Sequence, residues 1–152
     1  MKASVTISER EIVIEHRYSS FTADGAVATD ESTLIDGLFA GLNLILDKKT
    51  TITVDKTGKS LTIREKGRLR KENTRLFKSE QLREIVVLVH TQKRTLRRDK
   101  KTATVQVASK RSSDNPILLF LNEPYHEAIA VVLQVSESLG LPIRERDVLS
   151  KG

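Results

Sequence analysis

Thr51-Ile-Thr-Val-Asp-Lys-Thr-Gly-Lys-Ser-Leu-Thr-Ile-Arg64 is the stretch that decides the fold. Its apolar and polar residues alternate on both sides of Lys56-Thr-Gly-Lys59, a pattern typical of two antiparallel strands joined by a turn. Three later segments are rich in apolar and β-branched residues and lie between Gly, Asn, Asp or Pro: residues 85–89, 102–107 and 117–121. The last is an almost unbroken apolar run, as expected for a strand covered on both faces. The sequence therefore predicts a series of strands.

The segments on either side of this hairpin extend the series. Apolar residues around the polar tetrad 8–11 predict an N-terminal hairpin with strands 5–7 and 12–16. Residues 17–30 carry only weak signals and are interpreted as a loop. The charged run 65–74 is unsuited to a central strand, so we expect an edge strand or a loop between 67 and 77. A short turn at 79–82 leads into a strand at 84–91.

Two segments show helical spacing. The apolar residues of 34–46 follow Asp30-Glu-Ser-Thr33, in which Asp30 or Ser32 could cap a helix. Gly37 and Gly41 each cost about 1 kcal/mol relative to alanine there, so a helix covering the sheet, an interfacial membrane helix and a strand all remain open. The second helix ends at Gly140, before Pro142, and is predicted to bury one face, made of Ala128, Ile129, Val132, Leu133, Val135 and Leu139.

A length of 152 residues suits one domain with a core of its own. We find no internal repeat and no low-complexity linker. The predicted organisation is an N-terminal hairpin plus helical segment (1–49), a core meander with a C-terminal helix (50–143) and a polar tail (144–152). The fold class is therefore α+β, mostly β.

Catalytic and metal-binding signals are weak. The chain has no cysteine, which rules out disulfides, thiolate zinc sites and a cysteine nucleophile. His16, His90 and His126 fall in different predicted elements without ligand-like spacing, and no phosphate-cradling glycine motif occurs. Acid pairs such as Glu145 with Asp147 are placed in loops or the tail. We expect no metal, no cofactor and no catalytic residue, although an enzyme of unrecognised type stays a third hypothesis.

The same sequence predicts a cytoplasmic location, free or peripheral to a membrane. The first twenty residues lack the apolar core of a secretory signal. The longest apolar-rich stretch, residues 34–46, is interrupted by Asp36 and Asn43 and is too short and polar to span a bilayer.

Charge is the strongest functional signal. Residues 56–111 contain 18 Lys or Arg and 5 Asp or Glu, a net charge of +13, whereas the remainder is net negative. Such a polarised molecule attracts polyanions, unless the cations merely solvate a half-exposed sheet. Two clusters form the candidate site: Lys66, Arg68, Arg70 and Lys71, and then Lys93, Arg94, Arg97, Arg98, Lys100 and Lys101. The second cluster is predicted to connect two strands; whether the first shares that end of the sheet stays open.

Three stretches carry a resemblance to a known family. Residues 52–64, the strand at 84–89 and the ending Ser138-Leu-Gly-Leu-Pro-Ile143 are similar to bacterial pleckstrin-homology-like domains. They also faintly resemble the soluble part of the photosystem I assembly factor of cyanobacteria and plastids. The resemblance covers about residues 50–143 and implies an antiparallel barrel or half-barrel closed by a C-terminal amphipathic helix. It further implies a non-catalytic scaffold that binds lipid, peptide or protein.

The basic alternation Lys66-x-Arg68-x-Arg70 resembles the headgroup-binding hairpin of eukaryotic pleckstrin-homology domains, although here it follows the second strand of the region. The predicted function is an interaction or assembly module that docks through its basic loops to an acidic protein surface or an anionic membrane. The alternative is nonspecific nucleic-acid binding by counterion release, but an aromatic content of 4% argues against base stacking. A homodimer through Leu38, Phe39 and Leu42 is a further expectation.

Overall fold

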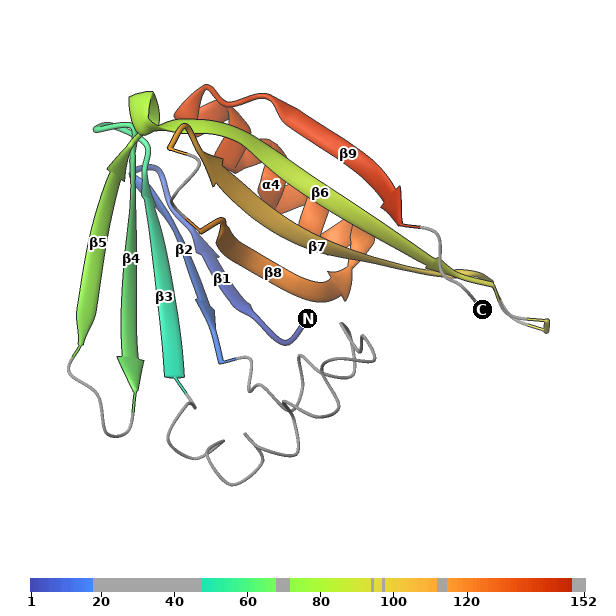
Figure 1. Ribbon diagram of the computed structural model, residues 1–152. Helices are drawn as coiled ribbons and strands as arrows, with labels where there is room; N and C mark the ends of the chain where they lie inside the picture. The colour runs from blue at the N-terminus through green and yellow to red at the C-terminus, as the bar shows by residue number, and fades with distance from the viewer. Residues whose placement is uncertain (18–47, 68–71, 94, 97, 112–114, 149–152) are drawn as a thin grey trace.

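The computed structural model describes residues 1–17, 48–67, 72–93, 95–96, 98–111 and 115–148. These residues form two β-sheets and one α-helix (Figure 1). The predicted helix at 34–46, and with it the dimer contacts of Leu38, Phe39 and Leu42, lies outside the described residues.

The first sheet, sheet A, is an antiparallel meander whose strands pair in chain order. Its strands are β1 (Ser4–Ile7), β2 (Glu11–His16), β3 (Lys48–Asp55), β4 (Ser60–Gly67) and β5 (Asn73–Lys78). Both predicted hairpins are confirmed, and β5 is the edge strand expected between 67 and 77.

Local polar contacts explain why both hairpins turn where they do. Ser8 Oγ accepts a hydrogen bond from the backbone N–H of Glu11 at 3.1 Å and closes the β1–β2 turn. In the β3–β4 turn, Asp55 Oδ1 accepts from the backbone N–H groups of Thr57 and Gly58 at 3.0 and 3.1 Å. A Cβ atom at Gly58 would lie 2.9 Å from Asp55 Oδ2, so a larger residue here would displace the Asp55 side chain.

The second sheet, sheet B, has the strand order β8-β7-β6-β9. The 3₁₀-helix η1 (Ser79–Gln81) turns the chain out of sheet A. Sheet B is then built from β6 (Leu82–Gln92), β7 (Lys100–Ser109), β8 (Ile117–Pro124) and β9 (Ile143–Val148). The predicted strands at 84–91, 102–107 and 117–121 are confirmed.

The prediction of a tail from residue 144 was wrong for residues up to 148. These residues form most of β9, which pairs in parallel with β6 from Ile85↔Ile143 to His90↔Val148. The parallel pairing is possible because the helix after β8 returns the chain across the sheet before β9 begins. Residues 149–152 lie outside the described residues.

The predicted C-terminal helix is confirmed as α4 (Tyr125–Leu139). It ends at Gly140, whose φ of 66° is left-handed, and Leu141 N donates to the Ser136 carbonyl at 3.1 Å. The buried face consists of Ala128, Val131, Val132, Val135 and Leu139. The predicted face was wrong at Leu133, which is 57% exposed, and it omitted Val131.

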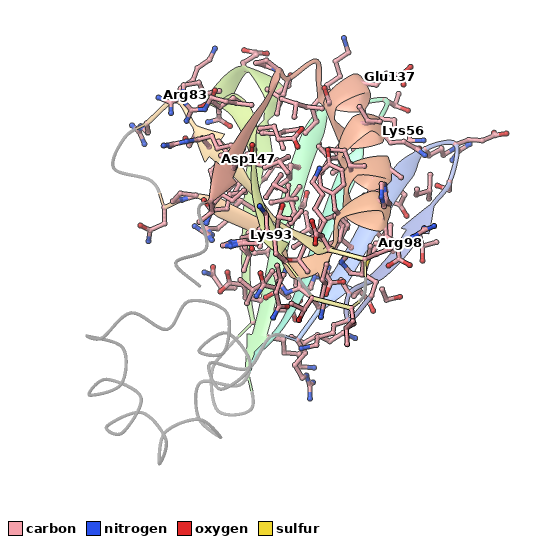
Figure 2. The ribbon with its side chains drawn as sticks, turned by 90° about the vertical axis from the view of Figure 1, so that its right-hand side faces the viewer. Lys56, Arg83, Lys93, Arg98, Glu137 and Asp147 are labelled. Atoms are coloured by element: carbon pink, nitrogen blue, oxygen red, sulfur yellow. The ribbon has the colours of Figure 1, made fainter. Side chains whose placement is uncertain are left out.

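One core joins the two sheets and α4. Alternate residues of both sheets point inward and belong to a single buried cluster with the apolar face of the helix. The helix packs on β7 and β8 and also contacts β3 of sheet A (Figure 2). Among the described strands no hydrogen-bonded ladder closes the two sheets into a barrel. The mostly-β α+β class is confirmed.

Polar contacts of two buried side chains link β8 to the first residues of the chain and to sheet A. Glu123 is only 1% exposed, and its carboxylate oxygens accept hydrogen bonds from the backbone N–H groups of Lys2 and Ala3 at 3.1 and 3.3 Å. His16 Nε2 lies 3.1 Å from the carbonyl oxygen of Leu118. A buried polar group is tolerated when it is bonded in this way, so these contacts fix how the two sheets meet.

Candidate functional site

The ten cations of the candidate site divide into two groups by position. Lys66 lies near the end of β4, whereas Lys93, Arg98, Lys100 and Lys101 lie where β6 runs into β7. The remaining five lie outside the described residues: Arg68, Arg70, Lys71, Arg94 and Arg97.

The structure does not bring Lys66 close to the second cluster. The end of β4 and the junction of β6 with β7 lie on opposite sides of the molecule (Figure 1). Lys66 instead aligns with Lys49 of β3, and Lys49 Nζ lies 3.7 Å from Glu15 Oε2. The described cations therefore do not make one continuous site.

Residues 91–101 form a projecting segment that we call the hairpin tip. Its last backbone pairs are Thr91↔Lys101 and Gln92↔Lys100. The neighbouring strands stop short of these pairs, because β9 ends at the position of His90 and β8 pairs no further than Thr102. Among the described residues, these two pairs are therefore flanked by no further strand, and the hairpin extends past β8 and β9 (Figure 1).

The strand alternation separates Lys100 from Lys101. Ile85, Val87 and Val89 of β6 are buried toward the core, so odd-numbered positions of β6 face inward. Lys101 pairs with the odd-numbered Thr91 and lies on this inner face, whereas Lys100 pairs with Gln92 and lies on the outer face.

Lys101 has a partner inside the fold. Its Nζ lies 4.1 Å from the ring centroid of Tyr125, a favourable cation–π contact. The Tyr125 hydroxyl donates to Glu145 Oε1 at 2.9 Å. This hydrogen bond, then partial burial and the negative charges of Glu145 and Asp147, raise the pKa of Tyr125 above 10.0. Lys101 thus contacts the first residue of α4, which is itself bonded to β9.

All the described cations of the hairpin tip, Lys101 included, are exposed, but Lys101 differs from the others in its contact with Tyr125. Lys93, Arg98 and Lys100 form no ion pair with any described residue, and Figure 2 shows Lys93 and Arg98 where β6 turns into β7. Elsewhere several cations are paired: Arg64 Nε lies 2.8 Å from Glu72 Oε1, and Arg144 Nη2 lies 3.1 Å from Glu84 Oε1. Asp99 is the single acid among residues 91–101. The hairpin tip therefore carries excess positive charge facing solvent.

Sequence reasoning missed a contribution from β9. Arg144 and Arg146 align with Val86 and Leu88, the half-buried outer-face residues of β6. They consequently share the outer face with Lys100, while Glu145 lies on the inner face with Tyr125. The alternation in charge sign of Arg144 and Arg146 with Glu145 and Asp147, bounded by Ile143 and Val148, was the signal in the sequence for this strand.

A pocket of about 260 Å³ lies at the end of sheet A, between its inner face and the start of β8. Its polar lining includes His16, Thr50, Glu65, Arg75 and Asn115. Three of these groups bond within the fold: His16 Nε2 lies 3.1 Å from the Leu118 carbonyl oxygen, and Arg75 Nη2 lies 3.5 Å from Glu65 Oε1. Within the described parts of the chain, no three His, Asp or Glu side chains gather as metal ligands.

Over the same described residues, no helix combines the length and the apolar character needed to cross a bilayer. Neither a family model nor a curated protein matches this chain.

Proposed function

We propose that this protein is a non-catalytic interaction or assembly module that docks through the hairpin tip to an anionic surface, either an acidic protein or a membrane. One observation carries the proposal: the hairpin tip projects from sheet B with Lys93, Arg98 and Lys100 exposed and unpaired among the described residues. The sequence adds Arg94 and Arg97 to the same segment.

The scale of the attraction is modest. A Lys or Arg close to an anionic bilayer contributes about 1 kcal/mol, and this contribution fades beyond the Debye length, about 8 Å at physiological salt. Five cations and one acid in residues 93–100 would then supply about 4 kcal/mol, equivalent to a Kd of about 1 mM. Docking through charge alone is therefore weak and salt-sensitive, which suits a reversible module.

The scaffold that we propose is a pleckstrin-homology-like half-barrel. Two antiparallel meanders followed by a C-terminal helix support this assignment. The parallel strand β9 is an addition to that layout, and it places Arg146 on the outer face next to the hairpin. We further propose that the module acts in the cytoplasm, partly at a membrane surface.

The test is a charge reversal with a matched control. The variant Arg98→Glu with Lys100→Glu changes two exposed cations of the hairpin tip. The control, Lys56→Glu with Lys110→Glu, changes the net charge by the same amount. Lys56 lies in the β3–β4 turn, and Lys110 follows the end of β7 that is remote from the hairpin tip. Binding is measured on anionic vesicles and on immobilised polyglutamate. The two reversals change the charge by four units, so at about 1 kcal/mol per unit we expect the tip variant to bind roughly a thousandfold more weakly.

The control should bind like the unmodified protein. Equal losses in both variants would show that only net charge matters, which would overturn the assignment to the hairpin tip. Binding to neither anionic support would overturn docking itself. Affinity for duplex DNA alone, falling steeply with salt, would instead establish the nucleic-acid alternative.

A further inference from the structure

Leu96 lies in the middle of the hairpin tip and is 97% exposed. The other exposed large hydrophobics of the described chain keep more contact with the protein; the next most exposed, Leu76, is 58% exposed. A single surface leucine is ordinary. What distinguishes Leu96 is that it is almost fully exposed and is flanked by cations in the sequence.

The hairpin holds Leu96 away from the body of the molecule. Beyond the last row shared with β8 and β9, β6 and β7 continue through two further strand pairs before the segment that contains Leu96. At about 3.3 Å per residue, these two pairs alone span roughly 7 Å. Leu96 can therefore contact a flat surface while α4 and both sheets stay clear of it.

The segment around Leu96 combines two kinds of exposed side chain, basic and apolar. Leu96 is within five residues of Lys93, Arg98 and Lys100, which are exposed and form no ion pair with described residues. A surface with a layer of phosphates above an apolar layer would fit both kinds of side chain. The long basic side chains can bond the headgroup phosphates, and the apolar side chain can pass below them. Nucleic acid offers the phosphates but no apolar layer within reach of the same loop.

We propose that the hairpin tip is a membrane-inserting device: its cations bind anionic lipid headgroups and Leu96 enters the apolar region beneath them. The inference rests on the proposed function and deepens it, because it selects an anionic bilayer among the anionic surfaces. An acidic protein would instead need a pocket matched to this one side chain.

The experiment uses the whole chain and places a reporter at the tip. The protein contains no tryptophan, so Leu96→Trp introduces a single fluorophore. The matched control is Leu133→Trp, at an exposed leucine of α4. Vesicles of phosphatidylcholine, with and without about one-third phosphatidylserine, are added at about 0.15 M salt. We expect the Leu96→Trp emission to shift to the blue only on anionic vesicles, and lipid-borne quenchers to reduce it. Leu133→Trp should change little.

A second variant measures what insertion contributes. Leu96→Ser keeps every charge of the hairpin tip, and we expect it to partition onto the anionic vesicles roughly tenfold more weakly, the effect of losing most of one buried leucine side chain. Binding could be salt-sensitive while the Leu96→Trp spectrum does not shift and Leu96→Ser keeps full affinity. That result would overturn insertion but leave charge-based docking intact. Binding to polyglutamate or DNA without any binding to vesicles would also overturn it. Absence of binding to every anionic support would overturn both proposals.

Discussion

At the scale of single residues, two neighbouring lysines have different roles because of the strand alternation. Lys100 points to the outer face at the base of the hairpin tip, where it is available to an anionic surface. The Lys101 amine lies over the Tyr125 ring, which is itself bonded to Glu145. The charge count identified both lysines as binding residues, but only the register of β6 with β7 separates them, and the sequence does not contain that register.

The hydroxyl group of Tyr125 should lose its proton at a higher pH than that of an ordinary tyrosine. Glu145 accepts the hydroxyl proton, so the neutral phenol is favoured in the folded protein and its pKa is raised above 10.0. The stabilisation is fully present below pH 10 and is lost as the pH rises through the higher folded-state pKa. In a Tyr18→Phe background Tyr125 is the only tyrosine, and phenolate absorbance should report this pKa directly.

Glu145→Gln, which removes the carboxylate charge, should move the pKa of Tyr125 back toward its ordinary value. If Glu145→Gln left the pKa of Tyr125 unchanged in the Tyr18→Phe background, the contact with Glu145 would be contradicted.

At the scale of elements, local sequence patterns predicted the hairpins and the end of the helix. They failed for elements whose pairing partner is far away in the sequence. The turns at Ser8–Glu11 and Lys56–Lys59 depend on nearby polar groups, so the sequence predicts them correctly. β9 was missed because its partner β6 is remote in sequence and its interior positions are all charged. The projection of the hairpin tip was also not predictable, since it depends on where β8 and β9 stop.

The buried face of α4 gives a prediction with an internal control. Val132 is fully buried against the sheets, whereas its neighbour Leu133 is largely exposed. Val132→Ala removes buried methyl groups and leaves a cavity, so we expect it to lower the free energy of unfolding by about 2 kcal/mol. Leu133→Ala should change it by less than about 0.5 kcal/mol. Urea denaturation measures both, and equal effects would mean that the helix is rotated from the orientation seen here.

At the scale of the whole molecule, the two sheets share one hydrophobic core. Residues of sheet A such as Ile52 and residues of sheet B such as Ile85 belong to one buried cluster with α4. The buried carboxylate of Glu123 and the ring of His16 add polar links between sheet A and β8. The sequence indicated the strands and the helix, but whether the sheets would close into a barrel depends on contacts between segments far apart in the chain. Period-2 and helical patterns carry no information about such contacts.

A shared core predicts one cooperative unfolding transition, as the single-domain interpretation of the sequence requires. Ile52→Val in sheet A and Ile85→Val in sheet B make the same chemical change at fully buried sites. Each should cost about 1 kcal/mol and lower Tm by about 2–4 °C. Because the sheets unfold together, each substitution should accelerate hydrogen exchange equally in β3 and in β6 under conditions where exchange requires global unfolding. If Ile52→Val accelerated exchange in sheet A alone, or if calorimetry resolved two transitions, the sheets would be independent units. In that case docking through the hairpin tip would need sheet B and α4 only.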